Sequence, residues 1–323
     1  MFYVETRDAH GKLNGIRVER LKDKLGTRKV PTAELMLDGT RAELVGDARN
    51  GTRAIEPMLV VTRTWNSVTS VAFMRRAFEL AKSYARERRA FGATLNELPL
   101  HADTLAGLEA HTRAAFLLAF ELVSLLGRHE AETLEADDAA LLRIVTPIAK
   151  LLTAKQAVAA VSEAIEAFGG AGYVEDTGLP ALLRDTQVLP IWEGTTNVLA
   201  LDAVLRSGLG PGLAAIRRRI IGITAQLQDE RLATLSNRSL AVLDEIEQWL
   251  ARHGDAQQLQ AGAREVAMSI GRALQLALLC EHAQWSLVHD ADSTTFAAAR
   301  RFASQPLSSL REIDLDATRA LAR

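Results

Sequence analysis

Residues 166–197 read EAFGGAGYVEDTGLPALLRDTQVLPIWEGTTN, and this stretch decides how the rest of the chain is interpreted. Helical patterns lie on both sides of it, whereas the stretch itself contains glycines at positions 169, 170, 172, 178 and 194. Glycine lets the backbone turn tightly or approach a ligand closely. One carboxylate, Glu193, follows the apolar residues Ile191 and Trp192, and a carboxylate among apolar neighbours is a candidate general base. Taken singly, a glycine pair or a lone glutamate is explained more simply by a helix end than by a functional site. The evidence for a functional site is that these residues occur together in one stretch.

That combination resembles the carboxyl-terminal signature of the acyl-CoA dehydrogenases. Its parts are Phe-Gly-Gly-x-Gly-Tyr at 168–173, Arg-Asp at 184–185 and Ile-Trp-Glu-Gly-Thr-Thr-Asn at 191–197. Trp192 before the glutamate and Asn197 after it are most similar to the branch that contains the bacterial alkylation-response flavoproteins. The resemblance implies a mainly α fold. Its centre is the family's carboxyl-terminal four-helix bundle, preceded by a remnant of the β domain and followed by an extra helical region.

Hydrophobic periodicity predicts the bundle over residues 51–206. Apolar residues recur at three- and four-residue steps, which is typical of helices with one buried face. Pro99 suits the first position of a helix, and Pro147 is expected to kink the helix that contains it. The expected helices cover about 51–89, 99–127, 139–168 and 194–208.

The two flanking regions differ from the bundle. Residues 1–50 contain short apolar segments at 2–4, 16–18 and 34–37, separated by glycine and proline, and these predict strands and turns. Three short strands leave exposed sheet edges, so we expect this region to be the end of a β domain and the chain to be a fragment or to have a misassigned start. Residues 207–323 predict further helices. They contain 13 arginines, no lysine and 13 acidic residues, so this region is neutral.

Composition excludes several classes of protein. A hydrophobic content of 48% with 24% charged residues is ordinary for a soluble protein, and a net charge of −2 gives no general attraction to nucleic acid or anionic lipid. The single cysteine, Cys280, lies in an apolar run and excludes internal disulfides. The apolar run 114–126 is short and contains Glu121, so it predicts a core helix and no membrane span. We therefore expect a cytoplasmic protein. The histidines and the cysteine follow no zinc or di-iron pattern, so no metal site is expected.

The resemblance assigns the reaction chemistry to the 191–197 motif. In the acyl-CoA dehydrogenases a base removes the proton next to the thioester carbonyl while the flavin accepts the β-hydride, and Glu193 matches that base. Gly194 and Trp192 match residues beside the substrate, and Arg63 matches an arginine that lines the substrate pocket. Trp192 replaces a more usual tyrosine, and Asn197 replaces a glutamine that contacts the flavin. A solvated position on a helix face explains Arg63 almost as well.

The resemblance also implies an FAD site. The residues that match cofactor contacts are Arg88, Phe91, Glu166, Gly169, Gly170, Thr195 and Asn197. In the family, the arginine at the position of Arg88 reaches the FAD pyrophosphate of a neighbouring subunit, which implies a homo-oligomer, and a guanidinium suits phosphate oxygens. The simpler alternative is that Arg88 and its basic neighbours stabilise the end of a helix.

Three hypotheses about function follow. The first is an FAD-dependent oxidoreductase that dehydrogenates an acyl-CoA thioester, with Glu193 as the base, in fatty acid metabolism. The second is an alkylation-response flavoprotein in which FAD is mainly structural and residues 207–323 contact DNA. The balanced charge of that region predicts at most a weak contact with DNA. The third is a helical interaction protein that does not bind a cofactor.

Overall fold

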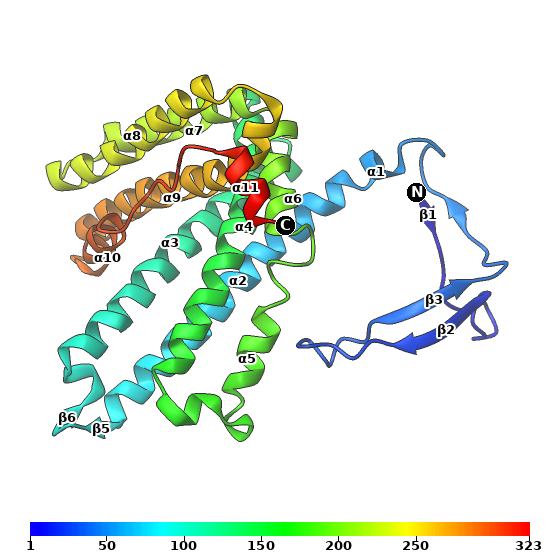
Figure 1. The fold of residues 1–323 in the computed structure, drawn as a ribbon, viewed down its shortest axis with the longest axis horizontal. Coiled ribbons are helices and arrows are strands. Elements are labelled where there is room, and N and C mark those ends of the chain that lie inside the picture. The colour runs from blue at the N-terminus through cyan, green and yellow to red at the C-terminus, as the bar shows by residue number, and fades with distance from the viewer. The chain divides into compact units, whose positions relative to one another are not determined.

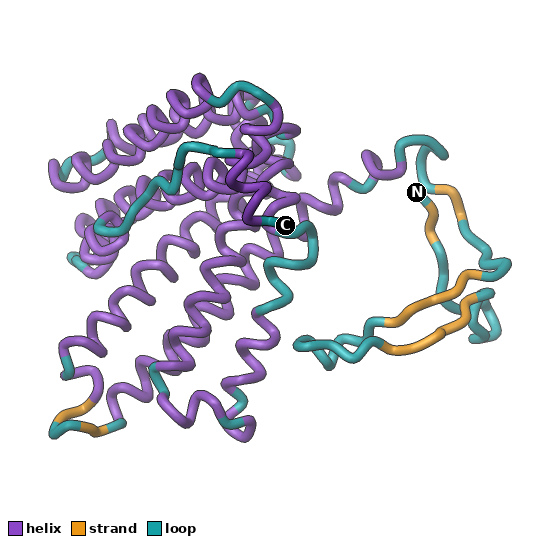
Figure 2. The backbone as a smooth tube through the Cα atoms, viewed as in Figure 1, coloured by secondary structure: helices purple, strands orange, loops and turns teal.

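The computed structural model describes residues 1–323, except for the side chains of Thr52 and Ala136. Two compact units, 1–62 and 63–323, divide the chain. Among the described residues, strands occur in the first unit and in one hairpin of the second, and helices make up most of the rest (Figure 2). The prediction of a mainly α fold is confirmed.

The first unit contains two small antiparallel ladders. The strands are β1 (Phe2–Tyr3), β2 (Ile16–Leu21), β3 (Ala33–Leu37) and β4 (Glu43–Leu44). β1 pairs with β4, and β2 pairs with β3 with a register shift between Val18 and Arg20. Ile16 is the one buried apolar side chain among the described residues of this unit, whereas Leu21 is 66% exposed. Among the described residues, these strands therefore do not bury a core of their own.

A short helix α1 (Gly51–Ala54) precedes the long helix α2 (Glu56–Glu87). After α2 the chain forms a hairpin of β5 (Arg89–Ala90) and β6 (Ala93–Thr94), followed by the 3-10 turn η1 (Leu95–Glu97). Phe91 and Gly92, with φ of 51° and 88°, form the turn of this hairpin. Two successive positive φ angles suit a tight hairpin, so the Phe-Gly pair ends the helix where the sequence predicted an end.

The helices α3 (Pro99–Glu130) and α4 (Ala136–Glu166) complete the long part of the bundle (Figure 1). α4 continues through Pro147 as one helix. Both helices are long and apolar enough to cross a membrane, but 44% and 78% of their most apolar windows are buried inside the fold. Apolar side chains of both helices pack into two buried clusters, one that contains Leu118 and another that contains Met74 of α2.

The segment after α4 departs from the prediction in detail. Two 3-10 turns, η2 (Gly169–Tyr173) and η3 (Glu175–Thr177), lead into α5 (Leu179–Thr186). The glycine-rich pattern of this segment did not predict the helix α5. The expected fourth helix is shorter than predicted. α6 (Thr196–Leu201) widens into the π-helical turn η4 (Asp202–Arg206), in which the Ser207 amide donates to the Asp202 carbonyl, 2.8 Å away. Three long helices and two short ones thus form this part of the bundle among the described residues.

The remaining helices pack onto the bundle and extend its core. They are α7 (Leu209–Gln226), α8 (Glu230–Arg252), α9 (Ala256–His289), α10 (Thr294–Ala303) and α11 (Leu315–Leu321). Asp229 and Asp255 cap α8 and α9 by accepting backbone N–H groups of the first turn. α9 lies at the centre of this region and contacts α3, α4, α7, α8 and α10, so a single core runs from Ala110 to Leu307. Cys280 is fully buried in that core, and burial raises the pKa of its thiol to about 12.

Candidate active site

Residues 189–195, called the Glu193 turn below, connect α5 to α6 in a strained conformation. The carbonyl of Val188 accepts hydrogen bonds from the amides of Ile191 (2.9 Å) and Trp192 (3.1 Å). Glu193 and Gly194 follow with φ of 59° and 104°. A positive φ costs a residue with a side chain about 1–3 kcal/mol, so the surrounding structure must hold Glu193 in place. Such strain is concentrated at functional sites in proteins.

Side chains of α2 and α4 hold this turn by donating hydrogen bonds to its carbonyl oxygens. The bonds join Asn66 Nδ2 to Leu189 O (3.2 Å), Arg63 Nε to Glu193 O (3.3 Å) and Lys150 Nζ to Gly194 O (2.7 Å). The donors come from positions more than 40 residues away in sequence. The conformation of the turn is therefore a product of the tertiary fold.

Two cations with different surroundings lie under the Glu193 turn. The side chain of Arg63 is 15% exposed, and its Nη1 atom forms an ion pair with Asp202 Oδ2 at 2.8 Å. Lys150 is fully buried. The pKa of Lys150 is lowered to about 8, mainly by burial and also by the positive charge of Arg63, while the negative charge of Glu193 acts in the opposite direction.

The structure brings one group of the predicted site residues together around this turn. These residues are Arg63, Trp192, Glu193, Gly194, Thr195 and Asn197. Glu193 is half-buried and Trp192 is 42% exposed, so the carboxylate and the indole both border accessible space. Arg63 contacts the backbone of the turn and Asp202. Its predicted contact with a substrate stays a prediction.

The other predicted residues form a second group at the far end of α2 and α4 (Figure 1). These are Arg88, Phe91, Glu166, Gly169 and Gly170. The rings of Tyr84 and Phe168 lie 4.7 Å apart and join the two helix ends. Phe91 is 94% exposed at the tip of its hairpin. Among the described residues the Arg88 side chain has no hydrogen bond or ion pair, and a Cβ added at Gly169 or Gly170 would meet no atom within 4 Å. This end therefore offers open backbone, an exposed ring and an unengaged guanidinium.

The two groups are far apart on the same chain. Arg63 and Arg88 both lie on or next to α2, and 25 residues at 1.5 Å rise per residue correspond to about 37 Å. The end group is thus too far from Glu193 to act on the same atoms.

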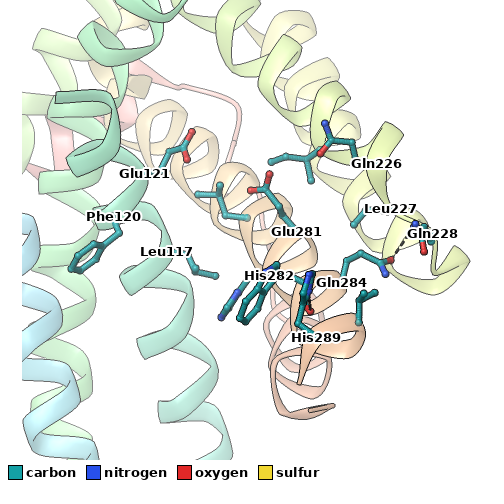
Figure 3. Close-up of a pocket in the computed structure, with 14 residues that line it drawn as sticks. Leu117, Phe120, Glu121, Gln226, Leu227, Gln228, Glu281, His282, Gln284 and His289 are labelled. Carbon is teal, nitrogen blue, oxygen red and sulfur yellow. Dashed lines mark hydrogen bonds between the residues drawn. The ribbon is translucent and has the colours of Figure 1, made fainter. Parts of the chain in front are cut away.

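A groove of 740 Å³ lies elsewhere, between α3, α7 and α9 (Figure 3). Leu117 and Phe120 line it from α3, and Trp285 from α9, but none of the predicted site residues does. Glu121 and Glu281, which line the groove, bind the Arg219 guanidinium, each at 2.8 Å. Burial alone would lower the pKa of Arg219, but these hydrogen bonds raise it above its usual value. The three charges stabilise the contact between α7 and its neighbours.

Arg217, Arg218 and Arg219 form a basic cluster in the region that the second hypothesis assigns to DNA contact, and all three are paired with carboxylates within the fold. Its pairs are Arg217 with Asp244 and Glu247, Arg218 with Asp137, and Arg219 with Glu121 and Glu281. Each arginine that contacts a carboxylate presents less net charge to a phosphate. The prediction of at most a weak contact with DNA stays a prediction.

Comparisons with known proteins match both helical regions. The acyl-CoA dehydrogenase C-terminal domain matches residues 49–208, and the acyl-CoA dehydrogenase 11 C-terminal domain-like family matches residues 214–321. Acyl-CoA dehydrogenase family member 11 of Caenorhabditis elegans is 45% identical over 321 residues, which are 96% of this chain and 52% of that protein. The putative acyl-CoA dehydrogenase AidB of Escherichia coli K12 is 36% identical over 203 residues, which are 63% of this chain and 37% of that protein. The crystal structure of C. elegans ACDH-11 in complex with C11-CoA has a TM-score of 0.90 and 45% identity, and the match covers 96% of this chain and 54% of that one.

The helices around the Glu193 turn thus have the architecture of the carboxyl-terminal bundle of a dehydrogenase fold. More particularly, the chain belongs to the acyl-CoA dehydrogenase family, which confirms the assignment made from the 166–197 motifs. Its last region is of the kind that ends acyl-CoA dehydrogenase 11. The chain spans about half the length of that relative.

Sequence reasoning missed three residues of the site: Lys150, Asn66 and Asp202. A signal for Lys150 was present, because α4 is apolar on all sides around it and a lysine in such a helix is seldom fully buried without a specific role. Asn66 and Asp202 carry no such signal. Their contacts link residues more than 120 positions apart, which periodicity does not reveal.

Proposed function

We propose that this chain is the carboxyl-terminal portion of an FAD-dependent acyl-CoA dehydrogenase-like enzyme that removes hydrogen from the α and β carbons of an acyl-CoA thioester. The observation that carries the proposal is the Glu193 turn. It holds a half-buried glutamate at positive φ on a backbone fixed by α2 and α4. The complex of the C. elegans relative with C11-CoA supports an acyl-CoA substrate.

In this proposal Glu193 removes the proton from the carbon next to the thioester carbonyl. A positioned base contributes roughly 10²–10⁴-fold to the rate of such a step. Trp192 would form one wall of the substrate pocket, and Gly194 would let the thioester approach the backbone because it carries no side chain.

FAD, when bound, would supply the acceptor for the β-hydride. The residues present fit this cofactor: Arg88 offers an unengaged guanidinium, Phe91 an exposed ring, and Gly169 and Gly170 an open backbone. Guanidinium groups suit pyrophosphate oxygens. Because this end lies about 37 Å along α2 from Arg63, it would serve the cofactor of a second copy, and we propose a homo-oligomer in the cytoplasm.

The test is anaerobic reduction of the flavin in the full-length form by a panel of acyl-CoA thioesters that differ in chain length. The proposal predicts bleaching of the flavin absorption band by at least one thioester. If no thioester bleaches the flavin and the protein instead retains duplex DNA at physiological salt, the alkylation-response hypothesis replaces it. If the purified protein holds no flavin, a helical interaction protein becomes the better description.

A further inference from the structure

We propose that Lys150 is a positioning residue for Glu193, an inference that rests on the proposed function of that carboxylate. The Lys150 ammonium holds the Gly194 carbonyl while Arg63 holds the preceding carbonyl of Glu193. Together they keep the Glu193 turn in the left-handed conformation that directs the base toward its substrate. Lys150 does not itself touch the reacting atoms.

The Glu193 turn needs such external support. Two successive residues have positive φ, and the first of them, Glu193, carries a side chain that disfavours this conformation. Thr195 at the start of α6 makes no side-chain capping bond that would fix the turn from its own end. The backbone is therefore held from the helices beneath it, through hydrogen bonds to its carbonyl oxygens.

The placement of Lys150 is costly and therefore informative. The side chain is fully buried, and among the ion pairs formed by the described residues none includes Lys150. Arg63, by contrast, forms an ion pair with Asp202 at 2.8 Å. A buried ammonium without a carboxylate partner is less favourable than an apolar side chain of the same length. If Lys150 only filled the core, a methionine would do so at lower cost.

The hydrogen bond to Gly194 gives the buried ammonium a specific role. At 2.7 Å it is the one hydrogen bond of the Lys150 side chain among the described residues. The negative charge of Glu193 acts on the pKa of Lys150, so the ammonium and the carboxylate lie close enough to interact. Lys150 thus joins a rigid position on α4 to the backbone that carries the base.

Hydrogen exchange on this chain tests the contact directly. Lys150→Met keeps the length and packing of the side chain but removes the donor and the charge. We expect amide exchange in residues 193–197 to rise at least roughly tenfold, with exchange in α3 and α9 unchanged. Lys155→Met, a half-buried lysine on the same helix, is the matched control and should leave the turn unchanged. Unchanged exchange in the turn, or an equal rise throughout the helices, would overturn the proposal.

Kinetics separate this inference from the proposed function. In the flavin-loaded full-length form, Lys150→Met should lower kcat for flavin reduction at least roughly tenfold and leave KM for the acyl-CoA unchanged, because the interaction acts on the base and not on substrate binding. Glu193→Gln is measured in parallel. If Glu193→Gln stops reduction and Lys150→Met changes neither kcat nor the exchange of the turn, the role of Lys150 is refuted and the proposed function stands. If Glu193→Gln has no effect, the proposed function fails and Lys150 has no base to position.

Discussion

The burial of Lys150 makes a quantitative prediction about the pH dependence of stability. Its pKa is lowered from 10.5 to about 8 in the folded chain. At about 1.4 kcal/mol per pKa unit this difference corresponds to about 3 kcal/mol. Between pH 8 and pH 10.5 the unfolded chain binds a proton at Lys150 that the folded chain has released, so the free energy of unfolding rises with pH. Below pH 8 both states are protonated and the full cost of burying the charge applies.

Lys150→Met removes this titration. Urea unfolding of wild type and variant, measured from about pH 7 to about pH 10.5, should show wild type gaining about 3 kcal/mol relative to the variant. The charged groups that face Lys150 are Arg63 and Glu193, with Asp202 behind Arg63, and they are present in both proteins. Other titrations common to both proteins cancel in the difference. Lys155→Met, at a half-buried lysine of the same helix, is measured in parallel as the control. A difference between wild type and Lys150→Met that is also flat with pH would refute the assignment of a buried, charged Lys150.

Two further predictions concern residues 207–323. A Cβ at Gly262 would overlap the ring of buried Trp249, so Gly262→Ala should destabilise the chain by about 1–3 kcal/mol. Gly222 lies in an exposed and open position in α7, so Gly222→Ala should stabilise the chain by about 0.5–1 kcal/mol. Thermal unfolding of both variants checks the signs, and two changes of the same sign would contradict the packing described. Alanine at all three positions of the cluster 217–219 should lower stability and leave DNA retention unchanged, because these arginines already pair with carboxylates. Loss of a DNA complex stable at physiological salt would show that the cluster contacts phosphate.

The sequence predicted the parts of the fold that depend on local pattern. The carboxyl-terminal end of α2 and the start of α3 were expected at Phe91-Gly92 and Pro99, because a tight turn and a favoured first helical position are local properties. α5 was concealed because eight residues between glycine-rich turns are too few to establish a helical period. The length of α6 was overestimated because η4 widens around Asp202, which an arginine 139 positions away binds.

The candidate site was predictable only as far as its motif extends. Glu193 and its neighbours were found because they are contiguous in sequence, and the glycines and Phe91 because they belong to motifs of the same family. The hydrogen bonds from Lys150 and Asn66 to the turn were not predicted, because the apolar periodicity of their helices carries no information about polar contacts that are distant in sequence. The one local signal was Lys150 itself, because a lysine is seldom fully buried in an apolar helix without a specific contact.

The most direct test of the central claim is the rate of anaerobic flavin reduction by an acyl-CoA in the full-length form, wild type against Glu193→Gln. Glutamine keeps the shape and hydrogen bonding of glutamate but cannot accept the proton. The account predicts a rate lower by roughly 10²–10⁴-fold, with flavin content and thermal unfolding near those of wild type. Equal rates in the two proteins would contradict the assignment of Glu193 as the base.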